Sequence, residues 1–209
     1  MIETYIVIAK EPVPGRVKTR LTPDVTAADA AELAAAALQD TLDAVDATPA
    51  RDRVLAFDGY AYDWLRPRWR HCDQAGGGLD MRLSAAFSNA ALQPAVLVGM
   101  DTPQVTPALL GQFDPATFDA CLGPTVDGGY WCIGLRDPSL APTVINGVPM
   151  STSWTFAAQL DRLRRHGLRV QVLDELIDVD TAADAQIVAQ LAPATAFAAT
   201  WLRLAEEAA

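Results

Sequence analysis

The chain has 209 residues, a formal net charge of −10 and a hydrophobic fraction of 51%. This length can bury one sizeable core, and the composition is typical of a folded protein rather than a disordered one. A chain with a pI near 4.5 lacks the broad basic face of nucleic-acid-binding proteins and the positive charge that docks on anionic membranes. We therefore expect neither nucleic acid nor a membrane as a partner.

Apolar runs alternate with helix-forming segments along the chain. The pattern predicts strands at 4–9, 53–57, 70–74, 95–100, 118–122, 130–135 and 169–173. It predicts helices at 26–45, 79–92, 153–166, 181–191 and 195–207, a short helix from Thr106-Pro107, and a proline-rich loop at 137–150. This alternation indicates one doubly wound, mostly parallel sheet. We expect a single α/β domain over residues 1–209, with C-terminal helices from about 181 to 209.

The three cysteines and two histidines do not form a pattern that favours metal or nucleophile chemistry. The cysteines lack metal-type spacing, so we interpret them as reduced thiols of a cytoplasmic protein. The histidines have no partners in the sequence that would indicate a zinc site or a catalytic triad. The apolar run before Lys10 is too short for a signal peptide, and no segment has the length of a membrane-spanning helix.

Both lysines of the chain lie in one loop, although the chain has fourteen arginines. Lys10 and Lys18 flank Gly15, with Arg16 and Arg20 beside them, directly after the first predicted strand. A glycine- and cation-rich turn at this place in an α/β protein commonly holds nucleotide phosphates. The alternative is a solvated basic loop. Two prolines and a glycine stiffen the segment and favour the phosphate interpretation.

Three aspartate positions follow strands or lie in glycine turns. Asp101 comes directly after an apolar strand, where it could hold a divalent cation or cap the next helix. Asp178 and Asp180 share one face of an extended segment, so either could complete a metal site, while Asp180 or Thr181 could cap a helix. Asp127 precedes paired glycines, which fits an acceptor-binding residue or base, and equally a tight hairpin turn.

Four motifs resemble a GT-A-like family, the arsenosugar-biosynthesis-type glycosyltransferases, long described as a domain of unknown function and related to GT-A nucleotidyltransferases. The motifs are Ile8-Ala9-Lys10-x-Pro12-x-Pro14-Gly15-x-Val17-Lys18-Thr19-Arg20-Leu21, Gly99-x-Asp101-x-Pro103, Gly123-Pro124-x-x-Asp127-Gly128-Gly129-Tyr130-x-x-Ile133-Gly134-Leu135 and Asp178-x-Asp180-Thr181-x-x-Asp184. The resemblance covers residues 6–184 and implies a single-domain GT-A, or nucleotide-diphospho-sugar transferase, fold with a mostly parallel central sheet flanked by helices.

The resemblance also implies roles for individual residues. The implied nucleotide-binding residues are Ala9, Lys10, Gly15, Arg16, Lys18, Arg20 and Arg82. Mg²⁺ or Mn²⁺ is expected on Asp101 and Asp180. Asp127 is expected to act on the acceptor hydroxyl and Lys18 on the developing phosphate charge, and both are therefore assigned as catalytic. Gly128, Gly129 and Tyr130 are expected to bind the acceptor. Asp80 stands where the family usually has glycine.

The leading functional hypothesis is a metal-dependent glycosyltransferase that uses a nucleotide-sugar donor and a small-molecule acceptor. A nucleotidyltransferase, which transfers NMP from an NTP to a phosphorylated small molecule, could use the same cations and carboxylates. A non-catalytic nucleotide-binding protein of the same fold is the third hypothesis, because fold alone does not decide function. Pyrophosphate release separates the second from the first, and metal-dependent binding without turnover identifies the third.

Overall fold

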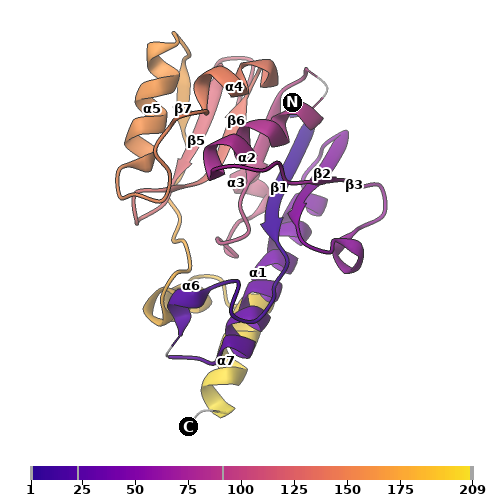
Figure 1. Ribbon diagram of the computed structural model, residues 1–209, viewed down its shortest axis with the longest axis vertical. Helices are drawn as coiled ribbons and strands as arrows, with labels where there is room; N and C mark the ends of the chain where they lie inside the picture. Colours follow the sequence, from indigo (N-terminus) through magenta and orange to yellow (C-terminus); the bar gives the residue numbers. More distant parts are fainter. Residues whose placement is uncertain (1, 23, 91, 208–209) are drawn as a thin grey trace.

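The computed structural model describes residues 2–22, 24–90 and 92–207, which form an α/β fold around one mixed sheet (Figure 1). Over these residues the seven strands are β1 (Thr4–Lys10), β2 (Asp52–Asp58), β3 (Arg70–Asp73), β4 (Ala95–Val98), β5 (Ala120–Pro124), β6 (Tyr130–Leu135) and β7 (Val170–Val172). Their order across the sheet is β3-β2-β1-β4-β6-β5-β7. Strand β6 runs antiparallel to β4 and β5, and the other pairs are parallel. The predicted mostly parallel α/β sheet is therefore confirmed.

Helices cover both faces of the sheet. They are α1 (Ala27–Ala47), α2 (Leu79–Ala86), α3 (Pro107–Leu110), α4 (Ala141–Val144), α5 (Thr155–Arg165), α6 (Ala182–Leu191) and α7 (Ala196–Glu207). Helices α1 and α3 pack into the core on one face, and α2, α4 and α5 into the core on the other. Thr26 begins α1 through a capping box with Asp29, and Thr181 begins α6 through the same motif with Asp184.

Two predicted segments differ from the structure. The helix expected at 79–92 ends at Ala86 and continues as a 3₁₀ turn, Phe87–Asn89; Ala91 of that prediction lies outside the described residues. The Asn89 amide donates to the Ala86 carbonyl at 3.2 Å, a bond that competes with continued helix. The loop expected at 137–150 contains a 3₁₀ turn and α4, because its prolines stand at the first helical positions, where they start helices.

A third core lies beyond the end of the sheet. The lower part of α1 in Figure 1 extends away from the strands and packs against α6 and α7. Leu21 and Val179, both fully buried, join this core from the two segments that lead away from the sheet. The cationic loop and the second aspartate segment are therefore both anchored on the same group of helices.

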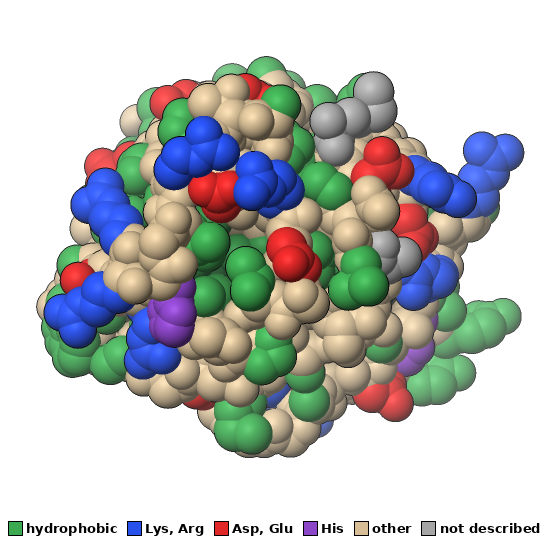
Figure 2. All heavy atoms as spheres, turned by 90° about the horizontal axis from the view of Figure 1, so that it is seen from above, with side chains coloured by type: hydrophobic (Ala, Val, Ile, Leu, Met, Phe, Trp, Pro, Cys, Tyr) green, Lys and Arg blue, Asp and Glu red, His purple; other side chains and the backbone are tan. Residues whose placement is uncertain are grey.

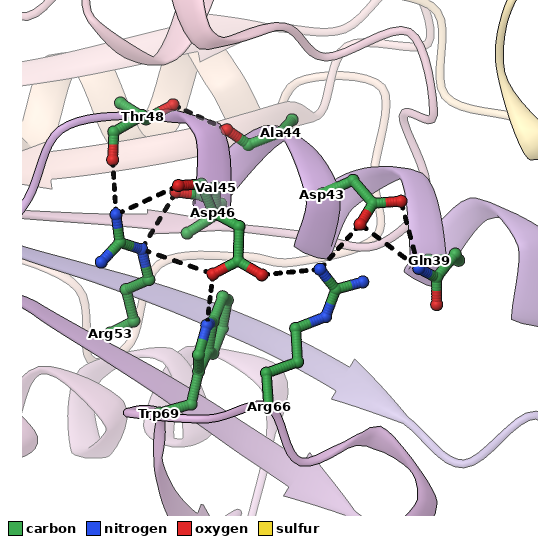
Figure 3. A network of polar contacts seen from close by, with 9 residues as sticks. All are labelled: Gln39, Asp43, Ala44, Val45, Asp46, Thr48, Arg53, Arg66 and Trp69. Carbon is green, nitrogen blue, oxygen red and sulfur yellow. Dashed lines mark hydrogen bonds and ion pairs between the residues drawn. The ribbon is translucent and has the colours of Figure 1, made fainter.

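A polar network fixes the connection between β2 and β3 against the last turns of α1 (Figure 3). Arg66 donates to Asp43 and Asp46, both at 2.7 Å, and the Trp69 indole donates to Asp46 at 2.7 Å. Arg53 donates to three carbonyl oxygens at the end of α1, at 3.1, 3.3 and 2.6 Å. A cation on these carbonyls satisfies groups that the helix itself leaves without partners.

The surface in one view carries charges of both signs, and the three cysteines are unpaired. On the face seen in Figure 2, Lys and Arg side chains are interspersed with Asp and Glu rather than gathered by sign. Cys72, Cys121 and Cys132 are free thiols, and the last two are buried. Among the described residues, no helix combines the length and the apolar character that crossing a bilayer requires.

Candidate active site

A cavity of about 700 Å³ opens beyond the carboxyl ends of β1 and β4. Open α/β sheets bind ligands at this edge. Of the residues predicted for the site, those that line the cavity are Ala9, Lys10, Arg16, Lys18, Arg20, Arg82, Asp101, Asp127, Gly129, Tyr130 and Asp180. Gly15 and Gly128 lie outside the lining. The fold thus brings the first, central and last motifs of the sequence to one place.

The cationic loop holds its shape through two residues with left-handed backbone. Gly15 has a φ of 77°, which glycine adopts without steric cost. Lys18 has a φ of 48°, a conformation that costs a residue with a side chain about 1–2 kcal/mol. Such strain is kept only where the surrounding contacts impose it. Lys10 is exposed at the cavity mouth, whereas the Lys18 side chain is only 4% exposed.

Lys18 joins the two aspartate segments. Its Nζ lies 2.5 Å from Asp101 Oδ1 and donates to the Val179 carbonyl, also at 2.5 Å. Burial alone would lower the pKa of Lys18, but the carboxylates of Asp101, Asp178 and Asp180 outweigh it and raise the pKa above its ordinary value. The ammonium therefore stays charged; it binds the Asp101 carboxylate and the Val179 carbonyl and also lines the cavity.

The segment around Val179 presents two aspartates to the cavity. Val179 is fully buried in the core of α1, α6 and α7, and its N–H donates to the Asp101 carbonyl at 3.0 Å. Side chains alternate along an extended segment, so Asp178 and Asp180 point the other way. One carboxylate oxygen from each of Asp127, Asp178 and Asp180 lies within 4.8 Å of the others. The shared face expected for Asp178 and Asp180 is therefore present.

Asp178 offers a buried carboxylate oxygen to a cation. Its Oδ1 is buried and has no hydrogen-bond partner among the described residues. Burial and the neighbouring Asp101 carboxylate, against the opposing effect of Lys18, raise the pKa of Asp178 to about 8. Oxygen donors of this kind suit hard divalent cations such as Mg²⁺ and Mn²⁺. The donor set of Asp127, Asp178 and Asp180 thus fits the predicted ion. Of the predicted pair, Asp180 belongs to this set, whereas Asp101 lies outside it and is bound to Lys18.

The tight turn expected at Asp127 is present. It lies in the turn that joins the antiparallel strands β5 and β6, and its Oδ1 accepts from Thr125 Oγ1 at 2.6 Å and from the Gly129 N–H at 3.0 Å. These bonds orient the carboxylate, which also lines the cavity. Among the alternatives for the other aspartates, Thr181 caps α6, while Asp101 does not cap α3, whose cap is Thr106.

Gly128 serves the site through packing rather than through the lining. Its φ is 89°, and a Cβ at this position would lie 2.0 Å from the Ser153 carbonyl oxygen. The Phe156 N–H donates to the Gly128 carbonyl at 2.8 Å. The glycine therefore lets the Asp127 turn lie directly against the segment 151–156.

We expect Gly128→Ala to destabilise the protein by about 2–3 kcal/mol, from the positive φ and the forced displacement of segment 151–156. Thermal or denaturant unfolding measures the change. Gly76→Ala is the matched control, since Gly76 has ordinary backbone and no described atom within 4 Å of the added Cβ. Equal unfolding midpoints for the two variants would contradict the packing role.

The structure adds residues that the sequence analysis did not assign. Gln74 donates to the Ala9 carbonyl at 2.7 Å and accepts from Arg82 at 3.2 Å, so it holds Arg82 at the cavity. Residues 150–155 form one side of the cavity. Gln74 carries no signal in the sequence, because a lone glutamine is common in loops.

A family profile described as "Uncharacterized protein conserved in bacteria (DUF2064)" matches residues 30–152. The chain belongs to this family. The DUF2064 chain has a TM-score of 0.86 to a "putative nucleotide-diphospho-sugar transferase" from Desulfovibrio desulfuricans G20, at 31% identity, covering 99% of this chain and 95% of that one. No curated protein sequence matches it.

Two more distant structures show the same fold as this DUF2064 protein. Rv0371C from Mycobacterium tuberculosis H37Rv, solved as a complex with manganese, has a TM-score of 0.57 at 20% identity, covering 90% of this chain and 98% of that one. The 2-C-methyl-D-erythritol 4-phosphate cytidylyltransferase of Thermus thermophilus has a TM-score of 0.57 at 14% identity, covering 92% and 100%. The DUF2064 fold is thus that of nucleotide-diphospho-sugar transferases and nucleotidyltransferases.

Proposed function

We propose that the protein is a metal-dependent glycosyltransferase that uses a nucleotide-sugar donor and a small-molecule acceptor. The observation that carries the proposal is one cavity that is lined by cations and carboxylates next to each other. The cations come from residues 10–20 and Arg82, and the carboxylates are Asp101, Asp127, Asp178 and Asp180, with Lys18 on Asp101 and Arg20 on Asp180. A diphosphate needs the cations, and a divalent cation together with a hydroxyl nucleophile needs the carboxylates. The similarity to a nucleotide-diphospho-sugar transferase fold supports this assignment.

The donor is proposed to lie along β1 and the cationic loop. Lys10, Arg16 and Arg20 bind the diphosphate, with backbone contacts from Ala9 and Gly15. Arg82 binds the nucleotide from α2. Lys18 stays on Asp101 and turns its charge toward the phosphates, where it stabilises the negative charge of the leaving nucleotide. Fixed cations in a partly enclosed cavity act more strongly than they would in water.

Asp101 and Asp180 are proposed as metal ligands, joined by Asp178. Asp101 has one oxygen on Lys18, and its side chain is 49% exposed toward the cavity. Asp180 is paired with Arg20 at 2.5 Å, an exposed contact that can be exchanged at little cost. When bound, Mg²⁺ or Mn²⁺ supplies positive charge to the diphosphate of the donor.

Asp127 is proposed to orient the acceptor and to accept its proton. The acceptor oxygen forms a bond to the anomeric carbon of the donor sugar, the bond from that carbon to the diphosphate oxygen breaks, and the nucleoside diphosphate leaves with the electron pair. The hydroxyl proton passes to Asp127. Gly129 holds the carboxylate through its N–H, and Tyr130 follows it on the wall of the cavity.

A thermal-shift panel tests this function. Each NTP and nucleotide sugar is added with Mn²⁺ or with EDTA, and we expect one nucleotide sugar to raise the melting temperature only with Mn²⁺. A ligand at 100 times its Kd stabilises the folded protein by about 2.7 kcal/mol. Stabilisation by NTPs alone, followed by pyrophosphate release, would replace the glycosyltransferase by a nucleotidyltransferase. Metal-dependent binding without turnover of any acceptor would indicate a nucleotide-binding protein.

A further inference from the structure

The cationic loop and the aspartates of the cavity are in contact with each other in this structure. Lys18 Nζ lies 2.5 Å from Asp101 Oδ1, and Arg20 donates to Asp180 Oδ2, also at 2.5 Å. Asp180 is also one of the three aspartates whose carboxylate oxygens lie within 4.8 Å of one another. The loop that is proposed to bind phosphates and the ion that is proposed to bind aspartates therefore share one carboxylate, that of Asp180.

The two cations differ in how firmly they are held. The Lys18 side chain is 4% exposed, and its ammonium has a second partner in the Val179 carbonyl. The Arg20 side chain is 69% exposed, and among the described residues Asp180 is the partner that holds its guanidinium. An exposed ion pair contributes little to stability, whereas a buried ammonium is costly to separate from its partners. Arg20 can therefore leave its aspartate much more readily than Lys18 can.

The backbone segments that carry Arg20 and Asp180 are anchored on the same group of helices. Leu21 follows Arg20, Val179 precedes Asp180, and both are fully buried in the core formed with α1, α6 and α7. Arg20 and Asp180 themselves line the cavity. A rotation of the Arg20 side chain alone can thus exchange Asp180 for a ligand inside the cavity, without a movement of either segment.

A divalent cation on Asp180 would weaken this ion pair. The two oxygens of one carboxylate are close together, so an ion bound to either of them lies near a guanidinium bound to the other, and like charges at short range repel each other. A diphosphate in the cavity offers the released guanidinium a more highly charged partner, which it can bind through two parallel N–H donors. The ion pair is therefore the less stable arrangement once both ligands are present.

We propose that Arg20 changes partner as the site is loaded, from Asp180 to the donor diphosphate, when a divalent cation binds to Asp180. This deepens the proposed function and rests on the metal ion and the diphosphate assigned there. Lys18 remains on Asp101, so Arg20 is the residue that couples the two ligands. Without a diphosphate, Arg20 competes with the cation for Asp180; with a diphosphate, Arg20 adds to its binding instead. Each ligand therefore raises the affinity for the other, by the same factor.

The first test measures Mn²⁺ binding to the full chain without any nucleotide, from the EPR signal of free Mn²⁺. Arg20→Met removes the competing guanidinium, and we expect the Kd of Mn²⁺ to fall by about threefold or more. Arg16→Met is the matched control: Arg16 is exposed in the same loop, lines the cavity and has no ion-pair partner among the described residues. This variant should change the Kd by less than about twofold, because charges exposed to solvent are screened.

The proposal is overturned if Arg20→Met binds Mn²⁺ no more tightly than Arg16→Met does. It is also overturned if neither the wild type nor Arg20→Met binds Mn²⁺.

The second test follows the guanidinium itself. In the arginine Nε–Hε spectrum, the Arg20 signal is identified by its absence from Arg20→Met. We expect its heteronuclear NOE to fall when Mg²⁺ saturates the protein, because the guanidinium leaves Asp180, and to rise again when inorganic pyrophosphate is added. Asp180→Ala, which lacks the partner, should give the low value without Mg²⁺. The exchange is overturned by an NOE that does not fall with Mg²⁺ or in Asp180→Ala, or that does not rise with pyrophosphate.

Neither test uses a nucleotide sugar, so this proposal and the proposed function can fail separately. If Arg20 exchanges as expected but no sugar transfer follows with any nucleotide sugar, the glycosyltransferase assignment fails and the coupling stands. If Mn²⁺-dependent sugar transfer occurs but Arg20→Met and Arg16→Met bind Mn²⁺ alike, the function stands and the coupling fails.

Discussion

Lys18→Met is expected to destabilise the protein and to remove most of its affinity for the donor. The substitution leaves Asp101, Asp178 and Asp180 together without the ammonium that now lies between them. Removing one partner of a buried ion pair costs about 3–5 kcal/mol, and because Asp101 is 49% exposed we expect a smaller loss, about 2 kcal/mol. Loss of one charged donor to a diphosphate should lower kcat/KM by about 10²–10³-fold.

Lys10→Met is the matched control, since Lys10 is the other lysine of the chain and is exposed in the same loop. It should raise the Kd of the nucleotide sugar and leave the melting temperature unchanged. Lys18→Arg should not restore the wild-type values, because the planar guanidinium does not fit the enclosed position of the ammonium. A Lys18→Met variant with wild-type melting temperature would show that the contacts with Asp101 and Val179 do not hold the site together.

Asp178→Asn is expected to act in opposite directions on stability and on metal binding. Burial and the neighbouring aspartates raise the pKa of Asp178 to about 8, so at neutral pH folding must protonate this carboxyl or bury its charge. Asparagine removes that cost and should stabilise the protein in EDTA by about 1–2 kcal/mol. The same change removes a proposed metal ligand. The Mn²⁺-dependent part of the stabilisation by the nucleotide sugar should therefore fall, with at least a tenfold higher apparent Kd for Mn²⁺.

The control for this variant is Asp174→Asn, an exposed aspartate four residues earlier whose carboxylate accepts from Gln112. It should change the free energy of unfolding in EDTA by less than about 0.5 kcal/mol and leave the response to Mn²⁺ as it is in the wild type. The metal role of Asp178 is contradicted if Asp178→Asn keeps the wild-type Mn²⁺ response, whatever its stability.

The parts of the fold that depend on local chemistry could be predicted. The cap at Thr26 was visible in the sequence because Asp29 lies three residues on, whereas the start of α6 was narrowed only to Asp180 or Thr181, of which Thr181 is the cap. The apolar runs of β1 and β4 were visible because strands in the middle of a sheet are buried on both faces. Helix α4 was missed because prolines end some helices and start others, and spacing alone does not separate the two.

The sequence predicted which residues form the site, but not which of them contact one another. The cationic loop and the aspartates could be assigned because strand ends and a family resemblance pointed to them. The bond from Lys18 to the carbonyl of Val179 joins residues 161 positions apart, so it follows only from the packing of the whole chain. Asp127, Gly129 and Tyr130 were assigned from the central motif, whereas the cavity-lining segment 150–155, which packs against the Gly128 turn, was not.

Because Val179 is buried among α1, α6 and α7, the opening of these helices and ligand binding at the neighbouring aspartates are coupled equilibria. A local opening of these helices would release Val179, and with it the register of the two aspartates on either side. Any ligand that bridges the cationic loop and these aspartates must then oppose that opening, by an amount set by its own binding free energy. The C-terminal helices lie away from the sheet, yet their stability affects ligand binding. The less stable these helices are, the more of the ligand's binding free energy is used to order the site, and the weaker its apparent affinity becomes.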